Sequence, residues 1–386
     1  MLILALAQCQ GGRKQRLDHG DKLQDLNLTL PEIADYYEAM SGRKLFYILL
    51  SLAVSVLLLA LLLRQIDPAL LKKTLLNIYL PGLAVYVAIH LLTVWLRAWR
   101  YRLLLQPQTC SWGGMLLATL VRNSFDDLLP ARLGSLSYIY VLNQRLGVPF
   151  EAATSSFVVA FVLDFLTLGP FLILTVLAAG AVSVPLSKGI LLAAALAFFL
   201  LTGLVLWKLS PLAGLVARIV KNLLRLFGQS EKRWARLAGD KLDQVHRSLD
   251  TIRRPKLMAV VCVQSLFIRL AKYVSIFCLL FGLLRSQGYR PADLNFWKTI
   301  LGLTGAEFTA ALPVKGLAGF GTWETAWTYT FRLLGFPQDL SVVSGLGVHL
   351  ITNALEYGLG IGALLILAFL FLKKNNKKRF AGKLKL

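Results

Sequence analysis

The chain has 386 residues, of which 56% are hydrophobic and 16% charged, and its mean hydropathy is +0.63. This apolar content excludes a water-soluble globular protein, because a soluble core of this size does not need so much apolar surface. The net charge of +22 is compatible with nucleic acid or anionic lipid, but the bases gather at the ends of apolar runs, which favours lipid and excludes nucleic acid.

The first 39 residues differ from the rest of the chain. Residues 1–8 are too short for the apolar region of a secretory signal, and residues 10–39 are polar with only a weak helical pattern. At Met40 the chain begins again as a short basic stretch followed by apolar residues. We therefore expect residues 1–39 to be either an upstream extension from a misassigned start or a loose cytoplasmic tail.

Six apolar stretches are long enough to cross a membrane as helices. These predicted spans are residues 45–63, 78–96, 152–182, 189–207, 257–284 and 340–372. The second span closes with WLRAWRYRLLL, where Trp95, Trp99 and Tyr101 alternate with arginines. Our interpretation is an interfacial helix end whose arginines snorkel to the cytoplasmic surface. The alternative is a rim of phosphate-contacting arginines at the mouth of a cavity.

The bases set the predicted orientation of the spans. Residues 208–256 hold twelve lysines and arginines, and a basic tail occupies residues 373–386. Both segments, and with them both termini, are predicted to be cytoplasmic. Apolar residues recur at helical spacing in the first half of the 208–256 loop, so we expect part of it to lie along the membrane surface. The loop and the tail would then contact anionic lipid.

Two stretches between the spans resemble each other. Residues 123–149 and 307–337 each contain Leu-Pro flanked by ionisable residues, then glycines, an apolar-aromatic stretch and a closing Leu-Gly-x-Pro. We interpret both as re-entrant broken-helix hairpins, centred on residues 111–149 and 296–336. The chain is thus predicted to be an all-α polytopic membrane protein with about six full spans and two re-entrant hairpins.

Counting sides from the basic segments places the two hairpins on opposite faces of the membrane. Residues 40–372 would form one transmembrane domain, made of a first repeat (about 111–208), the cytoplasmic loop and a second repeat (about 257–372). Such inverted repeats let secondary transporters build a site near the middle of the membrane. The inference requires that each hairpin returns to the side from which it enters.

Ionisable side chains within the repeats are the candidate functional residues, since each costs about 2.5–3.5 kcal/mol at membrane depth. Mutual neutralisation would make them purely structural. The candidates for a lipid-headgroup site are Asn123, Asp126, Asp127, Arg132, Asp164, Lys315, Glu324, His349 and Glu356. Arg132 and Lys315 lead this set, because each follows its Leu-Pro by two residues and lies near a glycine that lets backbone amides approach a phosphate. For Arg132 the alternative is an ion pair with Asp126 or Asp127.

Prolines and glycines in the same stretches are predicted hinges. They are Pro130, Gly134, Pro313, Gly316, Gly319 and Gly321. The glycines form no nucleotide-binding pattern, because no strand precedes them. The four cysteines show no metal-binding or redox spacing, and we expect unpaired thiols, no metal and no cofactor.

Two motifs carry a resemblance to a known family. The first is LLPARLG with Asn123 upstream and LGVP downstream, and the second is LPVKGLAGFGTWE with its following LG. Together they resemble the lysylphosphatidylglycerol synthase transmembrane family, a flippase-like family, over roughly residues 43–372. The family includes the flippase half of the multiple peptide resistance factor. By motif match, the positions that carry over are Asn123, Pro130, Arg132, Gly134, Pro313, Gly319, Gly321 and Glu324.

The resemblance implies a bacterial or archaeal plasma-membrane protein that handles a lipid with an anionic or modified headgroup. The chain departs from the family at Ser135, where a glutamate is usual, and at Phe161, where an arginine is usual. In the second repeat, His349 could fill the comparable basic position. We expect no aminoacyl-transferase domain in this chain.

Three functions remain open from the sequence. The first is a flippase or transporter of an anionic phospholipid or a polyprenyl-phosphate-linked lipid, driven downhill or by protons or membrane potential because no ATP-binding motif is present. The second is a membrane glycosyl- or headgroup transferase with Asp126 and Asp127 as base or metal ligands. The third is a non-catalytic membrane partner protein. The lipid and the oligomeric state are not predicted.

Overall fold

A computed structural model describes residues 56–108, 110–128, 134–178, 187–252, 254–309 and 317–383, and every regular element in these ranges is a helix. The elements in chain order are α4 (Pro68–Leu76), α5 (Leu80–Leu104), α6 (Trp112–Leu128), α7 (Leu136–Tyr140), η2 (Val141–Arg145), α8 (Phe150–Leu166), α9 (Leu168–Ala178), α10 (Lys188–Trp207), α11 (Leu209–Leu226), α12 (Arg233–Ile252), α13 (Pro255–Leu284), η3 (Arg285–Gln287), α14 (Pro291–Leu294), α15 (Phe296–Thr309), η4 (Leu317–Gly319), α16 (Thr322–Leu333) and α17 (Gln338–Lys383).

Five helical segments among the described residues are long and apolar enough to cross a membrane. They are Leu80–Leu104, Phe150–Ala178, Lys188–Trp207, Pro255–Gln287 and Gln338–Leu370. Each coincides with a predicted span, so the all-α polytopic membrane fold is confirmed. Of the remaining predicted span, residues 45–63, only residues 56–63 are described, and they are helical. Residues 1–39 lie outside the described part.

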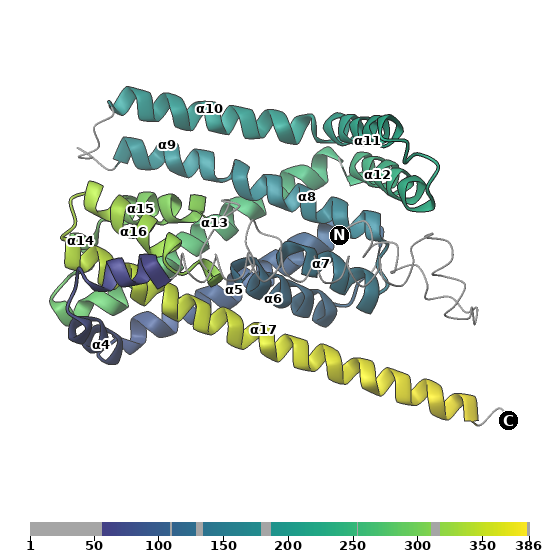
Figure 1. Cartoon of the computed structure of the whole chain (residues 1–386). Coiled ribbons are helices and arrows are strands. Elements are labelled where there is room, and N and C mark those ends of the chain that lie inside the picture. Colours follow the sequence, from purple (N-terminus) through teal and green to yellow (C-terminus); the bar gives the residue numbers. More distant parts are fainter. Residues whose placement is uncertain are drawn as a thin grey trace.

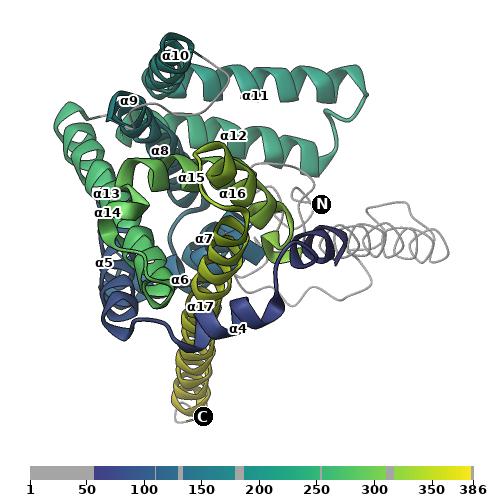
Figure 2. The ribbon, with the colours of Figure 1, turned by 90° about the vertical axis from the view of Figure 1, so that its left-hand side faces the viewer.

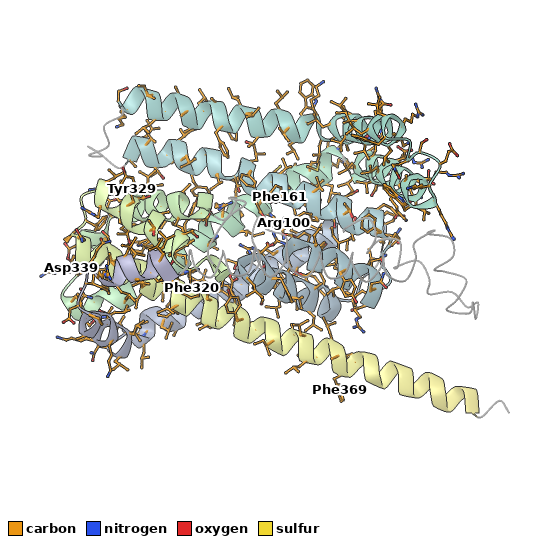
Figure 3. All side chains as sticks on the ribbon, in the orientation of Figure 1. Arg100, Phe161, Phe320, Tyr329, Asp339 and Phe369 are labelled. Atoms are coloured by element: carbon orange, nitrogen blue, oxygen red, sulfur yellow. The ribbon has the colours of Figure 1, made fainter. Side chains whose placement is uncertain are left out.

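The long helices form a bundle with two distinct ends (Figure 1). At one end, here called the α11 end, α11 and α12 lie beside the start of α8, and the Lys241 ammonium is 3.3 Å from the Glu151 carboxylate. At the other, the α14 end, the Gln287 amide donates to the Thr74 hydroxyl at 2.7 Å and so joins α4 to the turn after α13. Side chains such as Phe369 point outward from the bundle (Figure 3).

In the described residues, each predicted hairpin contains two helical arms: α6 and α7 with η2 in the first, and α15 and α16 in the second. In the second hairpin, the Lys298 ammonium at the start of α15 donates to the Leu334 carbonyl just after α16, at 3.0 Å. In the first, a Cβ on Gly114 near the start of α6 would lie 2.8 Å from the Leu146 side chain, just after η2. Each hairpin therefore returns to the end of the bundle at which it begins.

The two hairpins begin at opposite ends of the bundle. The first begins and ends at the α11 end, and the second at the α14 end (Figures 1 and 2). This is the geometry that an inverted arrangement requires. Which end faces the cytoplasm remains a prediction from the positive residues.

The Gly-x-Pro motif that closes both hairpins is explained by its backbone conformation. Gly147 and Gly335 both adopt positive φ, of 74° and 88°, which side-chain-bearing residues rarely take. Two residues later Pro149 and Pro337 precede the next long helix, where the fixed φ of proline suits a helix start. The repeated Gly-x-Pro thus ends each hairpin and begins a span.

Helices α5 and α13 cross at close range. The Tyr79 amide donates to the Gly282 carbonyl at 2.8 Å, and a Cβ added to Gly82 would lie 3.1 Å from the Gly282 Cα. Small residues let two apolar helices approach closely, and van der Waals packing then stabilises the pair inside a membrane. This crossing brings the arginines of α5 against α13.

The structure adds detail to two predicted segments. The span predicted at 152–182 consists of two helices, α8 and α9, which meet at Thr167. The 208–256 loop contains two helices, α11 and α12, and the helical spacing predicted in its first half falls in α11.

The three described cysteines are free thiols, as predicted, and Cys9 lies outside the described residues. Cys110 lies in the connection between α5 and α6. Burial raises the pKa of the Cys110 thiol, because the charged thiolate is poorly solvated there. The thiol therefore stays protonated at neutral pH and has little nucleophilic character.

Candidate functional site

Charged side chains from both repeats meet inside the bundle. We name this group the central charge network. Its members are Arg97 and Arg100 on α5, Arg122, Asn123 and Asp126 on α6, Asp164 on α8, Arg269 and Lys272 on α13, and Glu307 on α15. Asp164 is at the middle of the span Phe150–Ala178, and Arg269 is close to the middle of Pro255–Gln287. The network therefore lies at the depth where charge is least well solvated.

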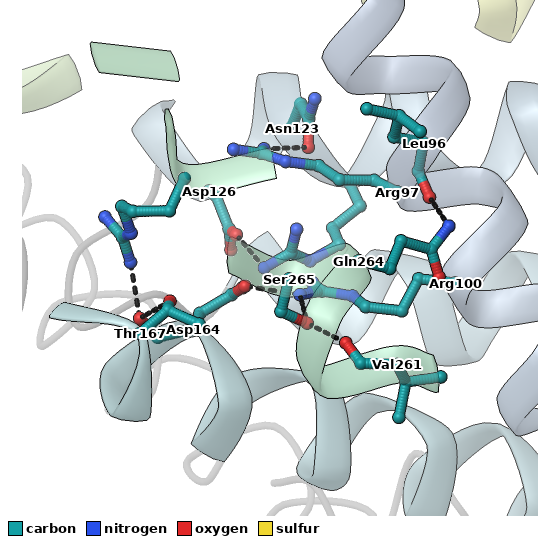
Figure 4. Close-up of polar contacts among 12 residues, drawn as sticks. Leu96, Arg97, Arg100, Asn123, Asp126, Asp164, Thr167, Val261, Gln264 and Ser265 are labelled. Carbon is teal, nitrogen blue, oxygen red and sulfur yellow. Dashed lines mark hydrogen bonds and ion pairs between the residues drawn. The ribbon is translucent and has the colours of Figure 1, made fainter. Parts of the chain in front are cut away.

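Arg100 is at the centre of the network (Figure 4). Its side chain is fully buried, and its Nη1 donates to Asp164 Oδ1 at 2.7 Å and to the Ser265 hydroxyl at 3.0 Å. Arg269 donates to the backbone carbonyl of Asp164. Two guanidinium groups from different helices thus converge on one residue of α8 and connect α5 and α13 to it.

Asp126 links the two arms of the first hairpin. Arg122, one helical turn earlier, lies 3.0 Å from Asp126 Oδ2, and the hydroxyl of Ser135 donates to Asp126 Oδ1. Ser135, one of the two positions at which the chain departs from the family pattern, is therefore in contact with a network carboxylate. Asp126 is thus paired with a cation of its own helix, Arg122, and this ion pair offsets the cost of burying the carboxylate.

Arg97 and Asn123 form the edge of the network next to Asp126. The Arg97 guanidinium donates to Asn123 Oδ1 at 3.4 Å, and the Gln264 amide on α13 donates to the Leu96 carbonyl at 3.1 Å (Figure 4). Electrostatic attraction also acts between Arg97 and Glu356 of α17. Helices α6 and α13 therefore both contact this part of α5.

The second hairpin joins the network through Glu307, near the inner end of α15. One Glu307 oxygen is 3.0 Å from Arg269 Nη1, and the other is 2.5 Å from Lys272 Nζ. Because Arg269 also contacts Asp164, a continuous chain of polar contacts runs from the first repeat to the second. Neither embedded base of α13 is left without a carboxylate.

The snorkelling interpretation of the α5 arginines is wrong for Arg100. The helix continues to Leu104, eight residues beyond the predicted span end, and this carries Arg100 into the interior (Figure 3). Arg97, Arg100, Tyr101 and Leu104 follow a helical i, i+3, i+4, i+7 pattern that describes one face. This spacing, together with acidic residues on other predicted spans, could have indicated from the sequence that an arginine of α5 is buried.

A second buried pair joins α16 of the second hairpin to α17. His349 Nδ1 is 2.6 Å from Glu324 Oε1, and the Gly321 amide donates to Glu324 Oε2 at 2.7 Å. The rings of Phe320 and Trp323 lie 4.8 and 4.7 Å from the imidazole, centroid to centroid. Gly319 and Gly321 have φ of 80° and 85°, and these turns direct the start of α16 toward α17.

Other predicted residues are placed apart from these pairs or outside the described structure. The backbone carbonyl of Glu356 accepts from the Ser124 hydroxyl at 2.6 Å, so α17 packs directly on α6. Gly134 packs against the backbone of α6. Outside the described residues lie Pro130, Arg132, Pro313, Lys315, Gly316 and the side chain of Asp127.

Among the described side chains, the network contains more cations than carboxylates. Its five cations are Arg97, Arg100, Arg122, Arg269 and Lys272, and its three carboxylates are Asp126, Asp164 and Glu307, with Glu356 of α17 as a further acid that attracts Arg97. Several of its buried N–H donors have no partner within the described residues: Arg97 Nε, Arg100 Nε and Nη2, Arg122 Nε and Asn123 Nδ2. An anionic headgroup would neutralise the excess positive charge and would accept hydrogen bonds from the donors that lack protein partners.

Comparisons with known proteins agree with this membrane-embedded arrangement. The family model described as the lysylphosphatidylglycerol synthase TM region matches residues 48–360, which include the whole central charge network. No curated protein and no solved structure matches the chain. No three His, Cys, Asp or Glu side chains in the described part are grouped as a metal site would need.

Proposed function

The chain belongs to the lysylphosphatidylglycerol synthase transmembrane family, and on this premise we propose that it moves a lipid with an anionic phosphate headgroup across a prokaryotic plasma membrane. The family itself implies a membrane lipid-related, flippase-like role. One observation carries the proposal for this chain: the cationic excess of the central charge network, at mid-depth, between two hairpins that open at opposite ends.

The headgroup would be held by the donors that lack protein partners. Arg97, Arg122 and Asn123 belong to α5 and α6, and their N–H groups without protein partners would together bind one phosphate. Guanidinium groups bind phosphate through several charge-assisted hydrogen bonds at once. Acyl or prenyl chains would remain in the bilayer, because only the headgroup is costly to transfer through it.

Alternating exposure would follow from the two hairpins. The first gives access from the α11 end and the second from the α14 end, and Arg269 and Glu307 join them in the middle. Exchange of partners within this chain of ion pairs would open one side as it closes the other. Arg132 and Lys315 belong to the segments between the hairpin arms, where they would receive the phosphate on each side.

Neutralising Arg97 tests the headgroup site. In proteoliposomes with dithionite-quenchable fluorescent lipids, Arg97→Gln is expected to slow movement of phosphatidylglycerol by about 10- to 100-fold, the effect of about 1.5–3 kcal/mol for a hydrogen bond to a charged group. Arg132→Ala and Lys315→Ala are expected to act in the same direction. Arg236→Gln, on the exposed surface of α12, is the matched control and should leave the rate unchanged.

Two results would oppose the proposal. Equal rates of lipid movement for Arg97→Gln and Arg236→Gln would show that the central charge network takes no part in that movement. A phenotype that survives these changes but is lost on altering the 208–256 loop would favour a non-catalytic membrane partner instead.

A further inference from the structure

The α11 helix turns sharply away from the span that precedes it. Lys208 is the only residue between α10 and α11. In Figure 2, α10 is seen nearly end-on, whereas α11 is seen from the side, so α11 runs across the direction of the spans. If α10 crosses the membrane, α11 lies parallel to its plane.

The depth of α11 follows from its first residues. Trp207 is 63% exposed, and the Lys208 ammonium lies 4.3 Å from the centroid of its ring. An exposed tryptophan at the end of the largely apolar, 20-residue helix α10, followed by lysine, is typical of the boundary between hydrocarbon and headgroups. The start of α11 is therefore at the membrane interface.

One face of α11 packs on α12. The Ser210 hydroxyl and carbonyl contact His246, and Lys221 lies 2.5 Å from Asp243. A Cβ on Gly214 would be 3.3 Å from the His246 ring, so the helices are in close contact here. Positions 210, 214, 217 and 221 share one side of the helix by their spacing.

The opposite face is apolar and exposed. Its side chains are between 39% and 80% accessible, and they are Leu212, Leu215, Val216, Ile219, Leu223, Leu226 and the adjoining Phe227. A helix that faced water on this side would carry polar residues there. Arg218 and Arg225 lie along one edge between the two faces, and α11 has no acidic residue.

We propose that α11 is an interfacial helix whose exposed apolar face inserts among the lipids of the leaflet at the α11 end, with its basic edge against anionic headgroups. A burial of this kind needs a wide apolar face, a basic flank and a helix axis in the membrane plane, and all three are present. The α12 helix covers the polar side and joins α11 to α8 through Lys241 and Glu151. The inference does not depend on lipid movement.

Spin-label accessibility tests this placement. In a background without native cysteines, nitroxides at Ile219→Cys and, as a second position, Leu223→Cys are compared with Asp240→Cys, which is exposed on α12. In nanodiscs that contain phosphatidylglycerol, the α11 labels should be more accessible to oxygen than to a water-soluble nickel chelate. The α12 label should show the reverse.

The basic edge is tested separately. Arg218→Gln with Arg225→Gln should abolish any deeper insertion of the Ile219 label in phosphatidylglycerol than in phosphatidylcholine. Nickel accessibility at Ile219 equal to that at Asp240 would overturn the proposal. Low accessibility to both reagents would also overturn it, since a second copy or another protein would then cover the face.

Discussion

Replacement of Arg100 by methionine is expected to lower the free energy of unfolding by about 3–5 kcal/mol, the range for removing one partner of a buried ion pair. The change leaves Asp164 without its 2.7 Å partner and Ser265 without a donor, at a depth where water cannot replace them. Methionine keeps much of the side-chain volume, so the loss reports charge more than cavity. Tryptophan fluorescence during unfolding in detergent measures it.

The double variant Arg100→Met with Asp164→Leu separates folding from function. Removing both charges together is far less costly than removing one, so part of the lost stability should return. Lipid movement should not return, because two members of the central charge network remain absent. Wild-type stability of Arg100→Met would contradict this account, because it would show that other groups neutralise Asp164.

A change of Gly134 to alanine is expected to destabilise the first hairpin by about 1–3 kcal/mol or more. The new Cβ would lie 1.8 Å from the Phe125 carbonyl oxygen and 2.2 Å from the Asp126 amide, and backbone atoms in a helix cannot yield as a flexible side chain does. The arms must separate, and the contact between Ser135 and Asp126 is lost with them. The same unfolding measurement applies.

Gly113→Ala is the matched control for this change. A Cβ on Gly113, near the start of α6, has nothing within 4 Å, so alanine should be neutral or should stabilise the helix by up to about 1 kcal/mol. Similar effects of the two substitutions would show that Gly134 is not confined by α6. A larger loss of stability for Gly134→Ala than for Gly113→Ala would show that position 134, a predicted hinge, has no room for a side chain.

The spans and the hairpin ends could be predicted from sequence because their causes are local. Apolar runs of sufficient length form spans, and the repeated Gly-x-Pro ends a hairpin through a positive φ at Gly147 and Gly335. Such signals depend on residues that are neighbours in the chain. The helix end after Trp95 was misplaced, since aromatic and basic residues suit a membrane boundary and a buried polar face equally well.

The partners within the site could not be predicted, because they come from distant parts of the chain. Asp164 was a candidate, but its guanidinium partner Arg100 lies on α5, and the helix crossing at Gly82 and Gly282 decides that they meet. Glu324 and His349 were both candidates, yet only the positive-φ glycines before α16 bring them together. Sequence reasoning thus identified several charged members without their pairing.

The opposite openings of the two hairpins are tested most directly by cysteine labelling in intact cells and in inside-out vesicles. Gln144→Cys ends the first hairpin, Arg332→Cys ends the second, and Arg236→Cys on α12 marks the α11 end; all three positions are exposed. A membrane-impermeant maleimide should reach Gln144→Cys and Arg236→Cys only in inside-out vesicles, and Arg332→Cys only in intact cells. Labelling of Gln144→Cys and Arg332→Cys from the same side would contradict the inverted arrangement and, with it, movement of a headgroup between the hairpins.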